Sequence, residues 1–546
     1  MNFWGNEQKV GAARSEKRIA VVFLFLAVGL LVVILSLFTA SGTKQYEEAA
    51  LQQSTYTLQV ASTRGTIYDT NLTPLVNENA NMVAAVAPST NAANAITAVF
   101  PSDRIQEIYT MLTAGTPFLL SIPEGVCVSG EGIDLFTVPE RYSETSLAVH
   151  TIGYTDADGN GVTGIELAFD DVLRENSGAA DVQYSVDAVN RVIAFQERTV
   201  TDTLSKSRGG VVLTLDKEIQ KIAENSAKKY LKKGAVVVTE VATGKIRAIV
   251  SLPSFSPEDV AAALEKEDAP LLDRALASYN VGSVFKLVAA AAALEYGISD
   301  SREYTCTGGH EVSGAVFHCF DETAHGTIDM KSAIAESCNG YFIDLMQSVP
   351  IPSFLKMAEA LGFGKSLLLT DGISSATGVL PTEESLRIPR ALANFSFGQG
   401  ELTASPVQIA SLTNTIASGG IYTALSLVEG TIGADGKWKV QDSDTGPCRV
   451  MKSTTALCLQ AFMKESVHTG TAAHGAPAFG GAGAKTGTAQ TGIFREGEEV
   501  LELWYTGFFP EDQPQYTITV LADDRTAKER SPCAEVFREI ADVLNQ

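Results

Sequence analysis

The chain has little of several residue types that would assign it to common functional classes. Its 546 residues include only seven cysteines and six histidines, and its formal net charge is −23. So few cysteines in so long a chain exclude a small disulfide scaffold, and the acidic balance leaves no footprint for nucleic acid. No phosphate-binding loop occurs and no histidine shows metal-ligand spacing, so we expect neither a cofactor nor a metal.

Three of the cysteines still need an interpretation. Cys306 and Cys319 flank a short stretch and could form a disulfide. Two free thiols are equally compatible with the sequence, because it does not define the distance between their Cα atoms. We interpret Cys338, which has no Cys/His/Asp pattern around it, as a packing residue, and His325, which precedes Gly326, as the anchor of a turn.

Charge is also absent from one long segment near the N-terminus. Residues 19–38 are apolar apart from Ser36, and 20 such residues can cross a bilayer. Basic residues precede the segment and Glu47 and Glu48 follow it, so we expect a cytoplasmic tail (1–18), an anchor in the cell membrane (19–40) and an extracytoplasmic remainder. The run exceeds a signal-peptide core and ends on the bulky Phe38, which favours an anchor that is not cleaved.

The remainder is long enough for two folded domains. Residues 44–53 are predicted to continue as a helix, and residues 41–209 read as an elongated pedestal domain of short strands and turns without a catalytic constellation. A second domain is predicted for 210–546. It begins with a hairpin over 235–250 and ends with strands at 504–509 and 516–522 and a helix over 532–544. We therefore expect an α+β fold whose antiparallel sheet is assembled from both ends of the domain and covered by helices.

Three polar motifs in this second domain carry the chemistry. They are Ser283-Val-Phe-Lys286, Ser337-Cys338-Asn339 and Lys485-Thr486-Gly487-Thr488. Ser-x-x-Lys also occurs at Ser41, Ser226 and Ser353, where we interpret it as chance. Ser283 instead opens an apolar helix-forming run that ends at Gly297, and a helix N-terminus favours negative charge. Lys286 lies on the same face, and burial would lower the pKa of its amine until it could activate the serine.

The other two motifs suit the recognition of a peptide. Lys485 follows the nearly side-chain-free stretch 480–484, and glycine in a strand usually marks the close approach of another backbone or a ligand. A peptide could pair with this edge as an added strand, with charge from Lys485 and a hydroxyl from Thr486. The segment 337–339 can cap a helix that begins near Gly340 while it projects Ser337 and Asn339 into a cleft.

Together the motifs resemble the acyl-transfer set of penicillin-binding proteins and serine β-lactamases. From about residue 60 onward the chain is similar to class B penicillin-binding proteins. Further segments that carry this resemblance are 273–276, 397–400, 402–410, 467–472, 503–510 and 516–520, and upstream Arg64–Asp69 and Gly164–Glu166. Val281, where the family usually has proline, and residues 70–72 depart from the pattern at framework positions only.

The resemblance implies a peptidoglycan D,D-transpeptidase. Ser283 would attack a D-Ala-D-Ala stem peptide with Lys286 as the base, Ser337 would relay a proton, and Asn339 would hold the donor amide. Lys485 and Thr486 would bind the terminal carboxylate, and Gly487 and Thr488 would also contact the substrate. The backbone N–H groups of Ser283 and Thr488 would form the oxyanion hole. β-Lactams would acylate Ser283. The implied partners are stem peptides, β-lactams and, from the resemblance alone, a SEDS-type membrane glycan polymerase.

Rival functions differ in what they would require. A β-lactamase commonly carries a Glu-x-x-Leu-Asn base, whereas here Glu383-Glu-Ser-Leu386 is followed by Arg387. A β-lactam sensor would need a cytoplasmic output from a tail of about eighteen residues. A scaffold with an inactive site is disfavoured by the presence of every motif residue, and residues 42–209 lack the acidic signature of a glycan-polymerising domain. Elongation, division and sporulation stay open as roles.

Overall fold

The computed structural model describes residues 5–41, 54–193, 198–441, 446–526 and 531–545. The chain divides into two compact units, and the region 41–209 contributes segments to both. The first unit comprises Met1–Ser62, Asn81–Val138 and Ala179–Leu204. The second comprises Thr63–Ala80, Pro139–Gly178 and Ser205–Gln546. The predicted helix over 44–53 lies outside the described residues.

Helix α1 (Gly5–Ser41) contains the segment predicted as an anchor. Its stretch Glu16–Thr39 is long and apolar enough to cross a membrane, and none of it is buried within the protein. Phe25 and Phe38, for example, expose 74% and 78% of their surface. Apolar side chains exposed all around a helix of this length suit a hydrocarbon environment rather than water.

The first unit is built on two three-stranded sheets. One has the order β1 (Thr55–Thr63), β6 (Gly178–Ser185), β7 (Thr199–Asp202), and the other the order β4 (Phe118–Ile122), β3 (Asn79–Val86), β5 (Ile133–Glu140). Side chains alternate along β3. Ala84 and Val86 pack against α3 (Thr90–Thr97) and α4 (Ser102–Ala114), whereas Ala85 packs with residues of β1 and β6. The three motifs lie elsewhere, in the second unit.

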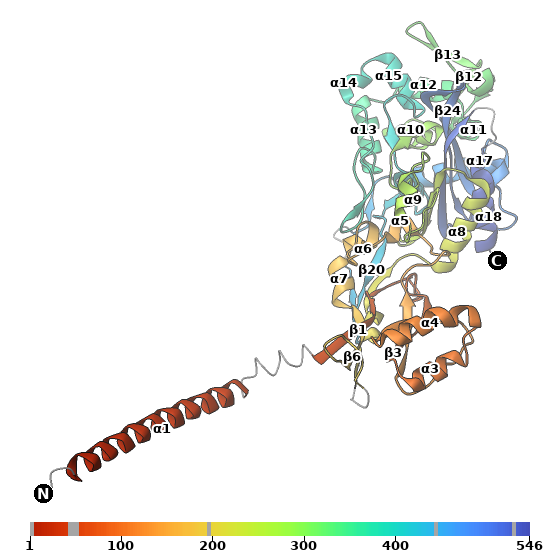
Figure 1. Ribbon diagram of the computed structural model, residues 1–546. Helices are drawn as coiled ribbons and strands as arrows, with labels where there is room; N and C mark the ends of the chain where they lie inside the picture. The colour runs from red at the N-terminus through yellow and green to blue at the C-terminus, as the bar shows by residue number, and fades with distance from the viewer. Residues whose placement is uncertain (1–4, 42–53, 194–197, 442–445, 527–530, 546) are drawn as a thin grey trace. The chain divides into compact units, whose positions relative to one another are not determined.

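The second unit is organised around a five-stranded antiparallel sheet (Figure 1). Its order is β10 (Ile246–Leu252), β9 (Gly234–Glu240), β25 (Tyr516–Thr526), β24 (Glu498–Phe509), β23 (Gly483–Arg495). β9 and β10 pair as the predicted hairpin, which is confirmed. Strand β25 connects the early hairpin with the late strands of the sheet, because its Val520 lies opposite Val236 of β9. Strand β23, which carries Lys485, is at the edge.

Helices cover both faces of this sheet because its strands are apolar on both faces. Val236 and Val238 of β9 pack in one core with α8 (Lys217–Tyr230) and α18 (Cys533–Leu544). Val237 packs in the other core, with α10 (Lys286–Tyr296) and α16 (Pro406–Ala417). The predicted C-terminal helix over 532–544 is confirmed to within one residue. α10 is buried between sheet and helices, as its nearly all-apolar sequence predicts.

Further elements complete the second unit. Further helices lie in sequence between the early and the late strands of the sheet. They are α11 (Met330–Ala335), α12 (Asn339–Met346), α13 (Ile351–Ala360), α15 (Pro389–Ser396) and α17 (Ser453–His468). A four-stranded sheet pairs β2 (Thr66–Tyr68) in parallel with β8 (Gly210–Leu213), and β8 antiparallel with β20 (Val428–Ile432), which pairs with β21 (Trp438–Val440).

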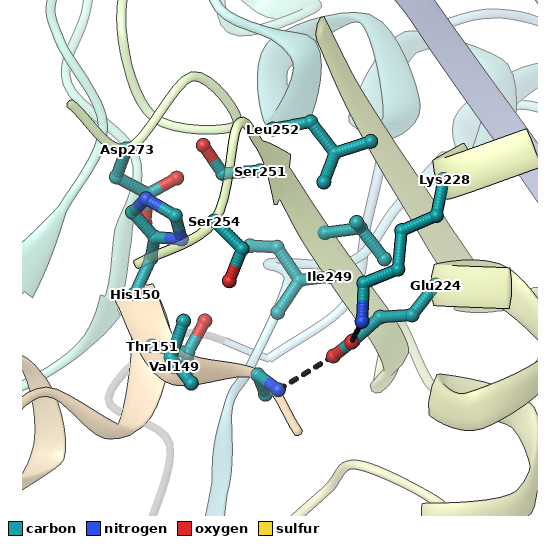
Figure 2. Close-up of a pocket in the computed structure, with 12 residues that line it drawn as sticks. Val149, His150, Thr151, Glu224, Lys228, Ile249, Ser251, Leu252, Ser254 and Asp273 are labelled. Atoms are coloured by element: carbon teal, nitrogen blue, oxygen red, sulfur yellow. Dashed lines mark hydrogen bonds and ion pairs between the residues drawn. The ribbon is translucent and has the colours of Figure 1, made fainter. Parts of the chain in front are cut away.

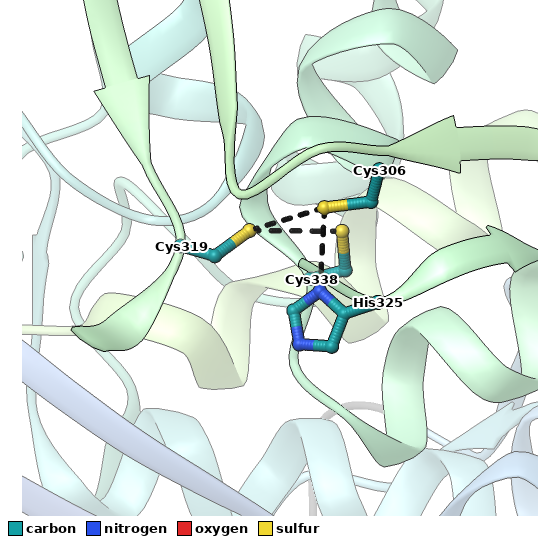
Figure 3. A group of neighbouring side chains, drawn as sticks. All are labelled: Cys306, Cys319, His325 and Cys338. Carbon is teal, nitrogen blue, oxygen red and sulfur yellow. Dashed lines mark hydrogen bonds between the residues drawn. The ribbon is translucent and has the colours of Figure 1, made fainter. Parts of the chain in front are cut away.

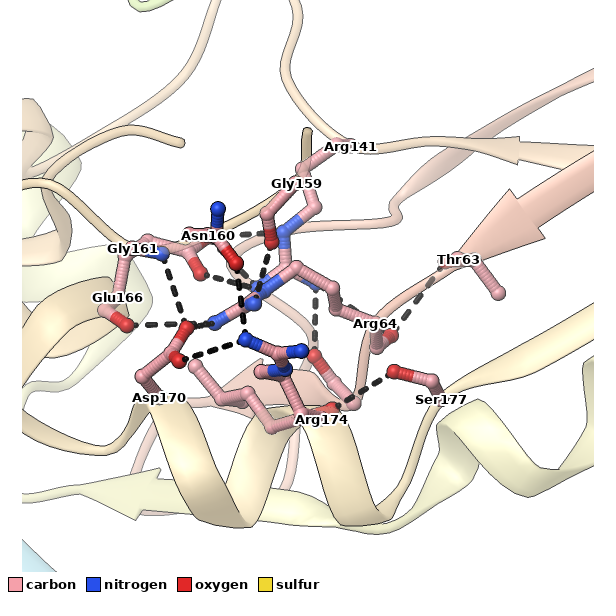
Figure 4. Close-up of polar contacts among 12 residues, drawn as sticks. Thr63, Arg64, Arg141, Gly159, Asn160, Gly161, Glu166, Asp170, Arg174 and Ser177 are labelled. Carbon is pink, nitrogen blue, oxygen red and sulfur yellow. Dashed lines mark hydrogen bonds and ion pairs between the residues drawn. The ribbon is translucent and has the colours of Figure 1, made fainter. Parts of the chain in front are cut away.

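A buried ionic cluster links the two upstream segments that carry the family resemblance, Arg64–Asp69 and Gly164–Glu166 (Figure 4). The Glu166 side chain is completely buried, with Arg64 Nε 3.2 Å from one carboxylate oxygen and Arg141 Nη2 2.6 Å from the other. The Tyr142 hydroxyl also donates to this carboxylate, at 2.9 Å. Arg64 reaches Asp170 as well, at 2.8 Å. Every charge in the cluster has an opposite partner, which is what allows burial.

Candidate active site

The serine of the first motif lies in a tight turn at the edge of the main sheet. The 3₁₀ turn Gly282–Phe285 leads into α10, and Gly297 ends that helix in the left-handed conformation, as predicted. Gly282 has a φ of 63°, and a Cβ on it would lie 2.6 Å from the carbonyl oxygen of Thr488. Only glycine permits this approach, so the backbone before Ser283 is held directly against β23.

Lys286 is fully buried and surrounded by oxygen atoms. Its Nζ lies 2.9 Å from Ser283 Oγ, 2.6 Å from the carbonyl oxygen of Ser337, 3.1 Å from Ser337 Oγ and 2.7 Å from Asn339 Oδ1. An ammonium has only three N–H groups, whereas a neutral amine has two and one lone pair. Since the carbonyl and amide oxygens only accept, a neutral Lys286 can donate to both and accept the hydroxyl proton of Ser283.

The electrostatics favour that neutral state. Burial lowers the pKa of Lys286 to about 7, although the neighbouring thiols of Cys338 and Cys319 act in the opposite direction. Burial also lowers the pKa of Lys485 well below its usual value, and the charge of Lys286 adds to the effect. An amine with a pKa near the working pH is suited to proton transfer.

Ser337 stands between the two lysines. Its Oγ is 3.1 Å from Lys286 Nζ and 3.0 Å from Lys485 Nζ. Its φ of 56° is uncommon for a residue other than glycine and is a type of backbone strain that often occurs at functional sites. Asn339 opens α12 and directs its Oδ1 at Lys286, while its Nδ2 donates to the carbonyl of His318 at 2.8 Å. Hydrogen bonds therefore hold Ser337 and Asn339, the residues on either side of Cys338.

The third motif lies on the edge strand β23. Thr486 is paired through its hydroxyl with Thr471, at 2.9 Å, and Gln399 Nε2 lies 3.4 Å from the carbonyl oxygen of Thr488. A Cβ on Gly487 would meet a methyl group of Val284 at 3.0 Å. Thr471 and Gln399 were not predicted as site residues, although both belong to segments that carried the family resemblance.

Two further residues hold the chain just before the serine. Glu502 accepts a hydrogen bond from the backbone N–H of Asn280, and Trp504 Nε1 donates to the carbonyl oxygen of Asn280 at 2.8 Å. Burial raises the pKa of Glu502 to about 8. The sequence offered no signal for this contact, because it depends on two strands that are more than 200 residues apart.

A group of soft metal-ligand types lies behind the second motif (Figure 3). Cys306, Cys319, His325 and Cys338 place one ligand atom each within 4.8 Å of all the others. Cys338 is buried in the core, as expected of a packing residue, but the expectation that no Cys/His pattern surrounds it is wrong. The group has no sequence signature because its four residues are irregularly spaced and meet only through tertiary folding. Cys306 and Cys319 are free thiols whose sulfur atoms are 3.7 Å apart.

Two hollows in the second unit lie apart from the motifs. One, which is small, is bordered by His150, Glu224 and Asp273 among apolar residues, and Glu224 there accepts from the backbone N–H of Ala148 at 2.7 Å (Figure 2). Burial lowers the pKa of His150 and raises that of Asp273. A neighbouring cavity of about 420 Å³ shares these two residues and has a mainly apolar wall. Neither contains a residue of the three motifs.

Comparison with known proteins agrees with the geometry. A family model, the penicillin binding protein transpeptidase domain, matches residues 234–542. Stage V sporulation protein D of Bacillus subtilis is 26% identical over 444 residues, which cover 77% of this chain and 67% of that protein. Peptidoglycan D,D-transpeptidase MrdA of Acinetobacter baumannii is 28% identical over 401 residues, or 66% of this chain and 57% of that protein. The chain thus spans only about three fifths of these relatives' length.

The fold has a counterpart among solved structures. Penicillin binding protein 3 of Mycobacterium tuberculosis, in complex with aztreonam, aligns with a TM-score of 0.64 at 22% identity. The alignment covers 90% of this chain and 96% of that one. The resemblance to class B penicillin-binding proteins is confirmed, and the expected α+β transpeptidase fold with it. Because the family model spans more than half of its residues, this chain belongs to the penicillin-binding protein transpeptidase family.

Proposed function

We propose that this chain cross-links peptidoglycan stem peptides by serine acyl transfer. The observation that carries the proposal is one connected hydrogen-bond network, in which Lys286 contacts Ser283, Ser337 and Asn339, and Ser337 also contacts Lys485. A hydroxyl paired with a buried amine of lowered pKa is the arrangement that nucleophilic acyl transfer requires. The names of the relatives, which include a peptidoglycan D,D-transpeptidase, support the same reaction.

In the first half-reaction Ser283 Oγ attacks the carbonyl carbon between the two D-alanines. Lys286 takes the hydroxyl proton, and the developing oxyanion is stabilised by the backbone N–H groups of Ser283 and Thr488. The C–N bond then breaks, and Ser337, which contacts both lysines, passes a proton to the leaving D-alanine amine. The product is an ester between Ser283 and the donor stem.

In the second half-reaction the amine of a neighbouring stem attacks that ester. Its surplus proton returns to the serine oxygen along the same route, and a new amide bond replaces the ester. Asn339 holds the donor amide throughout, and Lys485 with Thr486 binds the terminal carboxylate before it leaves. Gly487 and Thr488 continue the edge of β23, along which the donor peptide lies as an added strand.

The remainder of the chain is proposed to place this site outside the membrane. Helix α1 anchors the protein with residues 1–18 in the cytoplasm, following the positive-inside rule. The region 41–209 acts as an elongated pedestal between anchor and catalytic domain (210–546). The SEDS-type glycan polymerase implied by the resemblance is proposed as a partner in the membrane, and β-lactams as covalent inhibitors at Ser283.

The proposal is tested with fluorescent penicillin and the detergent-solubilised full chain. Wild-type protein should become covalently labelled, and Ser283→Ala should not, while its circular dichroism stays unchanged. Ser353→Ala is the matched control, because Ser353 and Lys356 have the same Ser-x-x-Lys spacing on α13. Labelling of Ser283→Ala at the wild-type rate would remove Ser283 from the role of nucleophile.

A further inference from the structure

The four residues behind the second motif have the composition and arrangement of a metal site. Cys306 ends β12 (Tyr304–Cys306), Cys319 follows β14 (Ala315–His318), His325 precedes β15 (Gly326–Ile328), and Cys338 caps α12. The three cysteines are at most 4% exposed, and their sulfur atoms face one another and the imidazole (Figure 3). Three thiols and one imidazole form a soft ligand set of the kind that binds zinc.

The distances match tetrahedral coordination. Two sulfur atoms on one zinc ion, each at about 2.3 Å, are about 3.8 Å apart at the tetrahedral angle, and a sulfur and a nitrogen about 3.5 Å. Cys319 Sγ lies 3.7 Å from Cys306 Sγ and 3.8 Å from Cys338 Sγ. His325 Nδ1 lies 3.4 Å from Cys306 Sγ. A disulfide requires about 2.05 Å between sulfurs, and it would leave one of the three thiols without a partner.

The connecting backbone supports a bound ion independently. Asp321 and Glu322, between Cys319 and His325, both have positive φ values, 52° and 55°. Two successive non-glycine residues in this conformation are unfavourable and persist only where the surroundings hold them. Backbone hydrogen bonds hold the turn in part, from the N–H of Glu322 to the carbonyl of Cys319 at 3.0 Å and from the N–H of Thr323 to the carbonyl of Phe320 at 3.1 Å. A metal bound by Cys319 and His325, one on each side of the turn, would add a further constraint.

We propose that Cys306, Cys319, His325 and Cys338 bind one Zn²⁺ ion, which holds the Ser337–Asn339 loop in its working position. With four protein ligands no coordination site remains for water, so the ion is structural rather than reactive. Cys338 separates Ser337, whose carbonyl accepts from Lys286, from Asn339, whose amide reaches the same amine. Cys319 follows His318, whose carbonyl accepts from Asn339. Two ligands thus adjoin the two backbone segments that position Asn339.

Metal content tests the site without reference to activity. The full chain, purified in detergent under reducing conditions, should contain about one zinc ion per chain, as measured by inductively coupled plasma mass spectrometry. Cys319→Ser and His325→Gln should lose zinc, with an affinity weakened by at least about tenfold. Cys458→Ser is the control, because Cys458 is a free thiol outside the group. Co²⁺ added to metal-free wild type should give the absorption of a tetrahedral thiolate complex.

The positioning role is tested separately and rests on the proposed function. Removal of zinc from wild type by a chelator should slow acylation by penicillin at least about tenfold, and Zn²⁺ but not Mg²⁺ should restore it. Ser283→Ala should keep its zinc and fail to acylate. If wild type never acylates, the proposed function fails while the zinc content still decides the metal site.

Metal-free protein that takes up neither Zn²⁺ nor Co²⁺, or a Cys306–Cys319 disulfide in the folded chain, would overturn the site. Unchanged acylation after zinc removal would overturn the positioning role.

Discussion

Two buried clusters of charged side chains in the second unit differ in how their charges are balanced. Around Glu166, two arginines and a tyrosine hydroxyl surround one carboxylate. Around Ser337, two lysines approach the same hydroxyl, and no carboxylate contributes to the pKa of either. Paired buried charges hold segments together, whereas burial without a carboxylate partner lowers the pKa of both amines, to about 7 for Lys286, which can then exchange a proton with a substrate. The balance of charge separates the structural cluster from the reactive one.

The largest expected effect comes from removing the reactive amine. Lys286→Met should slow acylation of Ser283 by penicillin on the order of 10²–10⁴-fold, because a positioned base is lost. The free energy of unfolding should fall modestly, because methionine fills the buried volume without a charge but leaves the carbonyl oxygen of Ser337 and Oδ1 of Asn339 without their donor, at about 1–3 kcal/mol for each. Stopped-flow labelling gives the rate and urea unfolding the stability. Lys356→Met, in the surface copy of the motif, is the control. A rate within twofold of wild type would mean that Lys286 is not the base.

The cluster around Glu166 should respond mainly in stability rather than in the acylation rate. Glu166→Gln leaves two buried guanidinium groups without their shared carboxylate, and breaking such a pair typically lowers the free energy of unfolding by about 3–5 kcal/mol. The acylation rate of the molecules that remain folded should be close to that of wild type. Urea unfolding of the full chain measures the first quantity and burst labelling the second. A stable variant with slow acylation would reverse the roles of the two clusters.

The sequence predicted the reactive cluster better than the structural one, for physical reasons. The hairpin over 235–250, the helix ending at Gly297 and the glycine-rich approach to Lys485 are local patterns that depend on neighbouring residues. The Cys/His group depends on two hairpins and a loop folding onto α12, so its spacing has no local signature. The division into two units likewise depends on packing of residues 63–80 and 139–178 with the later chain. The left-handed backbone of Ser337, which is not glycine, left no trace in the sequence.

A smaller effect is expected in the pH dependence of the acylation rate, which depends on the cluster around Ser337. Because burial lowers the pKa of Lys286 to about 7, its base form grows as pH rises and saturates above that value. The acylation rate should therefore increase about tenfold between pH 6 and pH 8 and change little above pH 8. Labelling rates in buffers of constant ionic strength provide the profile. A rate that falls over this range would require the protonated amine to be the active form.

The smallest effect is expected at the rim of the balanced cluster. Arg174 lies 3.7 Å from Asp170 and exposes 59% of its side chain. Exposed pairs contribute at most about 1 kcal/mol, so Arg174→Met should change the free energy of unfolding by no more than that. The same urea series that includes Glu166→Gln measures it. A loss as large as that of Glu166→Gln would show that burial does not distinguish the two positions.

Time-resolved mass spectrometry of the full chain with a penicillin, followed by peptide mapping, tests the central claim most directly. The account predicts a single adduct with the mass of the intact drug, located on Ser283 and persisting for many catalytic cycles of a β-lactamase. An adduct on another residue, or rapid hydrolysis that returns free protein, would contradict it.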